Sequence, residues 1–254
     1  MQKLRAAAEA VREGGRIGAA MLRDARVVRE KANEDIVTEG DLAVEKHVVE
    51  RLRRMFPDDG IDSEEMGAER TGADDVWVLD PIDGTKYYAR DVPLWTVSLG
   101  LRRGGAGVGG IVYSPPLDRM WFAAAGRGAT LNGQPIRCSD QADLSAAFLC
   151  VQIPGASFPD DELDWAGRKL FDLVRRSLRV RVLGVGALDL CLCAAGAFDA
   201  CINLGGPWKP CDVAAGWVIA SEAGAEVIQL ERRVVVAPPA LCDPILDALG
   251  LQRP

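Results

Sequence analysis

The sequence contains 254 residues, of which 48% are hydrophobic and 26% are charged, and its formal net charge is −7. A chain of this length and composition can bury a substantial core without a metal ion or a disulfide to hold it together. Because its acidity repels phosphate polymers, we expect no nucleic-acid partner.

The hydrophobic segments and the cysteines predict a cytoplasmic protein. No apolar run reaches the ~18 residues that a membrane-spanning helix requires, and residues 1–11 lack the apolar centre of a signal peptide. The seven cysteines have no regular spacing, and most of them lie in apolar stretches, as is typical of buried thiols in a reducing compartment. We therefore expect neither a membrane partner nor a zinc site.

The N-terminal part of the chain is expected to contain two helices followed by an antiparallel meander. Apolar residues recur at helical spacing over residues 4–22 and 42–56, and the second helix is expected to begin at Asp41. Turn residues at positions 57–60 end that helix. Strand-like runs separated by Gly- and Pro-rich turns follow at residues 76–79, 96–101, 108–113 and 120–123.

The later part of the chain alternates strands with helices. Strands are predicted at residues 144–151, 180–183, 200–204, 227–230 and 234–236, and helices at residues 162–178, 187–197, 213–223 and 244–249. This change predicts an α+β half, residues 1–140, packed against an α/β half, residues 141–254. We expect the two halves to form layered sheets and helices within one compact unit.

The stretch most informative about chemistry is an apolar strand, residues 76–79, that runs directly into Asp80-Pro81-Ile82-Asp83-Gly84-Thr85. Carboxylates of Asp80 and Asp83 at a strand end can converge on one hard cation, together with the Ile82 carbonyl. Gly84 lets the backbone approach a ligand closely, and free N–H groups after it suit a phosphate. An acidic surface turn is the alternative, but it does not explain the apolar strand directly before it.

These residues resemble the first signature of the inositol monophosphatase family. Three further segments match in the family's order. Asp62-Ser63-Glu64-Glu65 is similar to an acidic segment whose first Glu binds metal, and Asp35-Ile36-Val37-Thr38 with Asp41 is similar to the segment that supports a nucleophilic water. Cys211-Asp212-Val213-Ala214-Ala215-Gly216 resembles the second signature, whose Asp binds metal at a helix start. The resemblance spans roughly residues 5–250.

The resemblance implies a layered α-β-α-β-α sandwich, a homodimer, and a phosphatase with two or three Mg²⁺ ions per site. Glu64, Asp80 and the Ile82 carbonyl would hold the first ion. Asp80, Asp83 and Asp212 would hold the second. Because these ligands are all oxygen atoms, Mg²⁺ or Mn²⁺ is expected as the working metal.

The resemblance also implies catalytic and substrate-binding roles. The expected catalytic residues, which orient and deprotonate an attacking water, are Glu64, Thr85, Asp41 and Thr38. The expected substrate contacts are Asp83, Gly84, Thr85, Gly186, Ala187, Lys209 and Asp212. Lys209 precedes Asp212 by three residues, and it is interpreted either as a contact for a second anionic group or as a solvent-facing lysine.

Departures from the family pattern bear on the substrate. Gly205 stands where animal members carry a Glu that touches an inositol hydroxyl, and Cys211 replaces the usual Trp before Asp212. Both features resemble the microbial and archaeal branch, which accepts inositol phosphates and fructose 1,6-bisphosphate. Lys86, after Gly84-Thr85, resembles branches that act on histidinol phosphate or on nucleotide 3′-phosphates.

We expect a small polyol or sugar phosphate as substrate, with inositol 1-phosphate first. The alternatives within this chemistry are fructose 1,6-bisphosphate, histidinol phosphate and a 3′(2′),5′-bisphosphate nucleotide. The alternative from another class is a metal-binding regulatory or interaction protein.

Other motifs are interpreted as structural. The run Gly105-Ala106-Gly107-Val108-Gly109-Gly110 fits a dinucleotide-binding pattern, but a strand follows it where a helix is required, so a hairpin turn is expected. His47 is interpreted as a solvated side chain, and Trp95 as a candidate to face the site. The tryptophans assigned to the core are Trp77, Trp121 and Trp217.

Overall fold

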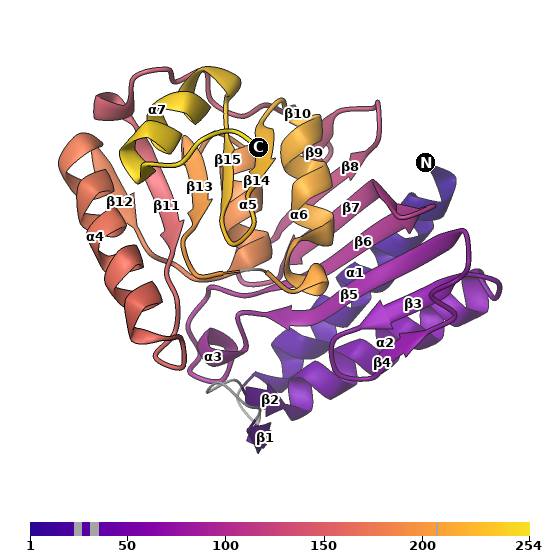
Figure 1. Cartoon of the computed structure of the whole chain (residues 1–254). Coiled ribbons are helices and arrows are strands. Elements are labelled where there is room, and N and C mark those ends of the chain that lie inside the picture. Colours follow the sequence, from indigo (N-terminus) through magenta and orange to yellow (C-terminus); the bar gives the residue numbers. More distant parts are fainter. Residues whose placement is uncertain (23–26, 31–35, 207) are drawn as a thin grey trace.

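The computed structural model describes residues 1–22, 27–30, 36–206 and 208–254, so Asp35 of the N-terminal motif lies outside the described residues. Helices and sheets alternate in layers (Figure 1). Helices α1 (Gln2–Met21) and α2 (Glu39–Met55) cover one face of an eight-stranded sheet. Helices α5 (Gly186–Ala194) and α6 (Pro210–Glu222) lie between that sheet and a five-stranded sheet. Helices α4 (Asp160–Arg176) and α7 (Pro239–Leu249) cover the other face of the five-stranded sheet. This arrangement confirms the predicted α-β-α-β-α layering.

Helix α2 begins two residues earlier than predicted because Thr38 caps it. The Thr38 hydroxyl accepts a hydrogen bond from the Asp41 N–H, and the Asp41 carboxylate accepts one from the Thr38 N–H. This capping box satisfies N–H groups at the helix start that would otherwise lack partners. The buried face of α2 packs closely against α1: a Cβ on Gly14 of α1 would lie 2.8 Å from a methyl group of Val48 on α2. The first two helices therefore form one tightly packed layer.

The eight-stranded sheet has the order β10-β9-β8-β7-β6-β5-β3-β4. Its strands are β3 (Gly60–Ser63), β4 (Gly67–Glu69), β5 (Asp75–Asp83), β6 (Thr96–Arg103), β7 (Ala106–Ser114), β8 (Arg119–Ala124), β9 (Ala129–Leu131) and β10 (Gln134–Ile136). Strands β5 to β8 pair antiparallel, as the predicted meander requires. The β6–β7 hairpin turns at Gly104 and Gly105, which have φ of 55° and 84°, so the expected hairpin is confirmed.

The five-stranded sheet has the order β12-β11-β13-β15-β14. Its strands are β11 (Phe148–Gln152), β12 (Arg179–Arg181), β13 (Ala200–Asn203), β14 (Glu226–Gln229) and β15 (Val234–Ala237). Strand β11 starts later than predicted because a short 3₁₀ turn, Leu144–Ala146, precedes it. Helix α7 starts earlier than predicted, at Pro239, and carries Pro244 inside it. Three short elements complete the described chain: β1 (Val27–Glu30) and β2 (Ile36–Thr38), which pair antiparallel, and α3 (Thr85–Tyr88).

Helices α5 and α6 are buried by a sheet on each side, which explains why both are apolar around most of their circumference. Helix α6 approaches the first sheet so closely that a Cβ on Gly110 would lie 2.3 Å from the Ala215 carbonyl oxygen. Helix α6 also contacts β5. The division into halves at residue 140 remains a prediction, since α5 and α6 join both sheets in one core.

Two interpretations of single side chains need correction. Trp95 does not face the site: it is 1% exposed and packs edge-on against Tyr88, with ring centroids 5.0 Å apart, inside the core beneath α1. His47 is half-buried rather than solvated, and its Nε2 lies 3.0 Å from a Glu13 carboxylate oxygen. Trp77 and Trp121 are buried as predicted, whereas Trp217 is only partly buried at the edge of the core.

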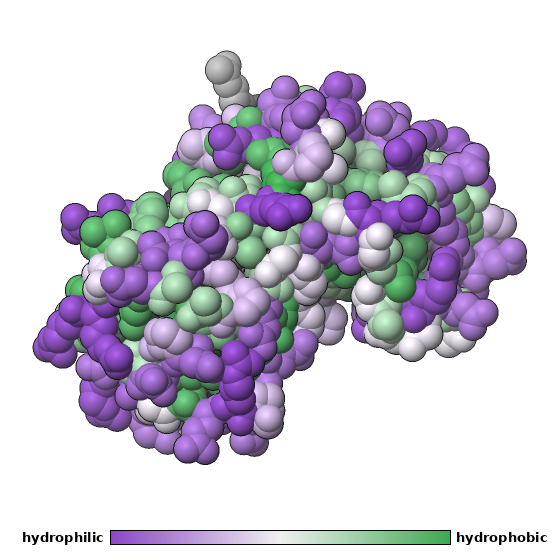
Figure 2. Space-filling model, turned by 90° about the horizontal axis from the view of Figure 1, so that it is seen from above, coloured by the Kyte–Doolittle hydropathy of each residue, from purple (hydrophilic) through white to green (hydrophobic). Residues whose placement is uncertain are grey.

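The outer surface agrees with the charged composition. Seen from above, hydrophilic side chains cover most of this face, and the hydrophobic areas between them are small (Figure 2). Among the described residues, no helix combines the length and the apolar character needed to cross a membrane.

Candidate metal centre

Three carboxylates and one thiol meet where β3, β5 and α6 converge. Glu64, Asp80, Cys211 and Asp212 each offer one ligand atom, and these atoms all lie within 4.8 Å of one another. Strand β3 runs parallel to β5, so the two strands end side by side, and the Glu64 N–H bonds the Leu79 carbonyl at 3.2 Å. Asp212 lies in the first turn of α6. The fold thus gathers donors from distant parts of the chain.

Asp83 also faces this cluster, although it follows Asp80 by three positions on one strand. In a regular strand, residues at that separation point to opposite faces. Here the pairing of β5 with β6 is irregular between Asp80 and Asp83, where Pro81 cannot donate a ladder hydrogen bond. The Ala187 N–H donates to Asp83 Oδ2 at 2.7 Å, which ties the start of α5 to the end of β5.

The electrostatics of this cluster fit a hard divalent cation. Asp80 is 2% exposed, and within the described chain its Oδ1 has no hydrogen-bond partner. Burial, followed by the charges of Glu64, Asp83 and Asp212, holds the pKa of Asp80 well above its usual value. Burial and the Asp212 charge do the same for the pKa of Asp83, and burial followed by the Glu64 charge raises the pKa of Asp212 to about 6. A bound cation would relieve this repulsion.

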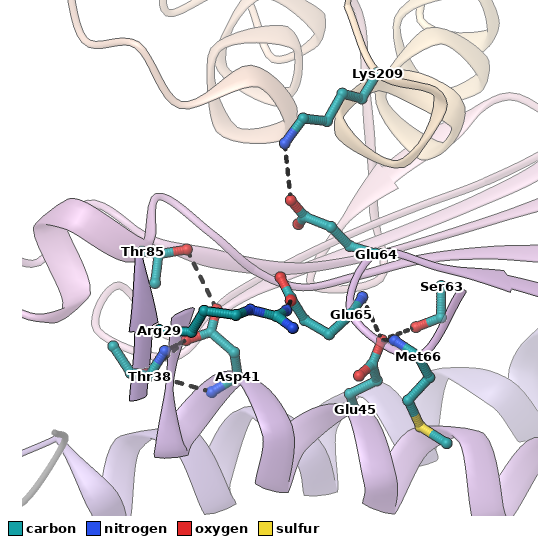
Figure 3. Close-up of polar contacts among 10 residues, drawn as sticks. All are labelled: Arg29, Thr38, Asp41, Glu45, Ser63, Glu64, Glu65, Met66, Thr85 and Lys209. Carbon is teal, nitrogen blue, oxygen red and sulfur yellow. Dashed lines mark hydrogen bonds and ion pairs between the residues drawn. The ribbon is translucent and has the colours of Figure 1, made fainter. Parts of the chain in front are cut away.

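Three of the four expected water-activating residues, Thr38, Asp41 and Thr85, form one hydrogen-bonded chain (Figure 3). The Thr85 hydroxyl lies 3.2 Å from Asp41 Oδ1 and 2.9 Å from the Ile82 carbonyl oxygen. Asp41 Oδ2 accepts from the Thr38 N–H at 2.8 Å and from the Thr38 hydroxyl at 2.5 Å. Burial raises the pKa of Asp41 to about 6, although the Thr38 and Thr85 hydrogen bonds oppose the shift.

Gly84 makes the turn into α3 possible. Its φ of 95° is in the left-handed region that favours glycine. A Cβ at this position would also lie 2.6 Å from the Leu94 carbonyl oxygen. Any larger residue would therefore be strained at the turn that leads into Thr85.

Glu45 is a positioning residue that the sequence interpretation missed. This carboxylate is fully buried on α2, and its Oε1 accepts from the N–H groups of Glu65 at 2.9 Å and Met66 at 3.0 Å and from the Ser63 hydroxyl. These bonds hold the turn that carries Glu64, while Glu65 pairs with Arg29 at 2.7 Å (Figure 3). A charged residue next to Val44 on the apolar stripe of α2 was the available signal.

Two further side chains lie beside the carboxylates. The Lys209 ammonium lies 3.0 Å from Glu64 Oε1, so it reaches across to an expected metal ligand (Figure 3). The Cys211 thiol lies beside the three carboxylates and donates to Asp212 Oδ1 at 3.4 Å. Burial raises the pKa of this thiol, which favours a neutral S–H over a thiolate ligand, so the expectation of all-oxygen metal ligands stays a prediction.

A cleft of about 360 Å³ opens over the cluster. Nine of the predicted site residues line it: Glu64, Asp80, Ile82, Asp83, Gly84, Thr85, Gly186, Lys209 and Asp212. Thr38, Asp41 and Ala187 lie behind this lining and act through the contacts described above. The lining residues that the sequence interpretation did not assign to the site include Tyr87, Gln152, Leu183 and Trp208.

A layered α/β fold with a buried carboxylate cluster at an open cleft is the arrangement of a metal-dependent phosphomonoesterase. Comparison with known proteins agrees: residues 1–245 match the model of the inositol monophosphatase family. The chain belongs to this family, which consists of metal-dependent phosphomonoesterases.

Individual relatives give the same assignment. A "Fructose-1,6-bisphosphatase/inositol-1-monophosphatase" of Aquifex aeolicus is 36% identical over 197 residues, covering 78% of this chain and 73% of the relative. A "Nus factor SuhB" of Pseudomonas aeruginosa is 36% identical over 204 residues, covering 79% of this chain and 74% of the relative. The solved structure of an inositol monophosphatase from Anabaena superimposes with a TM-score of 0.84 at 31% identity, covering 99% and 96% of the two chains.

Proposed function

We propose that the chain is a Mg²⁺-dependent phosphatase of small polyol or sugar phosphates, with inositol 1-phosphate as the leading substrate. The observation that carries this proposal is the meeting of Glu64, Asp80 and Asp212 beneath an open cleft that Asp83 also lines. Two or three Mg²⁺ ions would be held by these carboxylates and the Ile82 carbonyl, and Mn²⁺ would serve in their place.

The residues on the water side suggest how the reaction proceeds. When bound, Mg²⁺ supplies Lewis acidity toward the phosphate and lowers the pKa of a bound water. The Thr85 hydroxyl faces two acceptors, Asp41 Oδ1 and the Ile82 carbonyl, so its hydrogen points to one of them and its lone pairs remain for a water. Glu64 and the Thr85–Asp41 pair would then orient that water and remove its proton.

The phosphate would be held at the rim of the cluster. Gly84 and Thr85 line the cleft directly after the metal-ligand segment, so their backbone N–H groups are the proposed phosphate contacts. Asp83, Asp212, Gly186, Ala187 and Lys209 complete the proposed substrate contacts. Ala187 would contribute through its hydrogen bond to Asp83.

The identity of the substrate is open to a direct test. The printed name of the Aquifex relative covers both fructose 1,6-bisphosphate and inositol 1-phosphate, and histidinol phosphate and a 3′(2′),5′-bisphosphate nucleotide remain alternatives. Phosphate release should be measured with each of the four compounds and Mg²⁺. The proposal predicts the highest kcat/KM with inositol 1-phosphate, and turnover of none of them would contradict a phosphatase function.

A second candidate function is supported by the relative named as a Nus factor, which suggests a regulatory or interaction protein. The complete set of Glu64, Asp80, Asp83, Thr85 and Asp212 favours catalysis, because each would be dispensable in a protein that only binds a partner. Wild-type turnover that is lost when Asp83 is replaced would favour the enzyme.

We also propose a cytoplasmic homodimer. In support, β12 is an edge strand, and four large apolar side chains on or beside α4 and β12 are exposed: Phe171 (60%), Val174 (49%), Leu178 (63%) and Val182 (43%). Exposed apolar groups next to an open sheet edge favour association with another chain. Light scattering should give twice the monomer mass, and a monomeric mass at micromolar concentration would contradict the dimer.

A further inference from the structure

The wall of the cleft carries an amide whose orientation is fixed by two hydrogen bonds. Gln152, the last residue of β11, lines the cleft. Its Oε1 accepts from the Trp208 indole N–H at 2.6 Å, and its Nε2 donates to Asp189 Oδ2 at 2.9 Å. An indole N–H can only donate, so Oε1 must face Trp208 and Nε2 must face Asp189.

One partner of Gln152, Asp189, is itself held in place. Asp189 is fully buried in the first turn of α5. On the Trp208 side, residues 203–206 form a hydrogen-bonded loop, since the Asn203 side chain donates to the Gly206 carbonyl and accepts from the Gly205 N–H, both at 2.7 Å. The loop also packs closely on β11, because a Cβ on Gly205 would lie 3.1 Å from the Ile153 carbonyl oxygen. The Gln152 amide is therefore preorganised.

This amide lies within reach of a substrate whose phosphate is held at the carboxylate cluster. A Cβ placed on Gly186 would lie 3.8 Å from Gln152 Nε2 and 3.4 Å from the Asp212 Cβ. Gly186 thus sits between the Gln152 amide and an expected metal ligand, and its missing side chain leaves space there for the alcohol part of a phosphate ester.

We propose that Gln152 selects phosphate esters whose alcohol part carries hydroxyl groups. Its Nε2 has a second N–H and its Oε1 has a second lone pair, beyond the bonds to Asp189 and Trp208. A donor and an acceptor side by side match neighbouring hydroxyls of a polyol or sugar, each of which can donate and accept. The Trp208 ring, which lines the same cleft, offers an apolar surface to the carbon skeleton.

This inference rests on the proposed phosphatase function, and the test separates the two. Steady-state kinetics with Mg²⁺ should compare inositol 1-phosphate with ethyl phosphate, whose alcohol part has no hydroxyl. We expect Gln152→Ala to lower kcat/KM for inositol 1-phosphate about tenfold, mainly through KM, and to change that for ethyl phosphate by less than about twofold. Gln134→Ala, at an exposed position on β10, is the matched control and should change neither.

The outcomes are distinguishable. Gln152→Leu, which keeps most of the side-chain volume, should show the same selective loss and replaces the alanine variant if that variant melts early. Equal losses on both substrates, or no loss on either, would overturn the role of Gln152 while leaving the phosphatase intact. A wild type that releases phosphate from neither substrate would instead overturn the proposed function.

Discussion

The two ends of strand β5 carry buried carboxylates in opposite electrostatic settings. At its start, Asp75 is bound by Arg103 at 2.7 and 2.9 Å and by Lys3 at 2.5 Å, and these contacts lower its pKa to about 2. At its end, burial and neighbouring carboxylates hold the pKa of Asp80 and Asp83 well above the usual value.

Asp75 therefore stabilises the fold, whereas Asp80 and Asp83 are suited to bind a cation. Asp75 has cations within the chain, so ionisation favours the folded state. Asp80 and Asp83 are surrounded by like charges, so their ionisation opposes folding until a cation is supplied from outside. Replacing a carboxylate at each end should therefore have opposite consequences for activity and stability.

The largest effect is expected at the end of the strand. Asp83→Asn should lower kcat by at least about 100-fold at saturating Mg²⁺, because a neutral amide is a weaker ligand for a hard cation. The amide oxygen can still accept the Ala187 N–H, so the melting temperature in EDTA should be equal to or higher than that of the wild type. Asp58→Asn, at an exposed turn position, is the control. Near wild-type turnover by Asp83→Asn would contradict its assignment as a ligand.

Asp75→Asn, at the start of the strand, should lower stability and leave activity unchanged. Because the folded-state pKa of Asp75 is about 2, below its ordinary value of 3.8, Asp75 stabilises the fold above pH ~4, and this stabilisation is lost as the pH falls toward 2. The variant should lose about 1–2 kcal/mol of unfolding free energy at pH 7, with kcat unchanged. Urea unfolding from pH 7 to pH 2.5 measures this, with exposed Asp74→Asn as control. A deficit that stays constant with pH would refute the ionic origin.

A smaller effect is expected at Lys209, which brings a cation of the chain itself to the cluster. Its side chain is 53% exposed, so solvent weakens its charge. Lys209→Ala should raise KM for fructose 1,6-bisphosphate about tenfold and KM for inositol 1-phosphate much less, if its ammonium binds a second anionic group. Lys86→Ala, at another lysine of the cleft, shows whether the effect is specific to Lys209. Equal effects of Lys209→Ala on both substrates would leave it without this role.

Local sequence predicted the metal side of the cleft far better than the substrate side. Asp80 and Asp83 follow a continuous apolar run, and Asp212 precedes a helical pattern. Each can therefore be recognised as a candidate ligand from the few residues around it. The layered fold followed from the family resemblance and from the change in periodicity near residue 144.

The substrate side depends on contacts that no local pattern contains. Gln152 and Asp189 are 37 positions apart and Gln152 and Trp208 are 56 apart, on elements that meet only in the folded sheet-and-helix stack. Trp95 was misplaced for the same reason: its proximity to the metal-ligand segment in sequence gave no information on which face of the sheet it occupies. Cys211 was noted only as a departure from the family pattern, because its nearness to Glu64 is a tertiary contact.

The most direct test of the central claim is the dependence of phosphate release on the divalent cation. Wild-type protein should be dialysed against EDTA, and phosphate release from inositol 1-phosphate should be measured before and after Mg²⁺ is added. If the carboxylates at the end of β5 hold the working metal, activity will disappear on chelation and return with Mg²⁺. Full activity after exhaustive chelation would contradict the account.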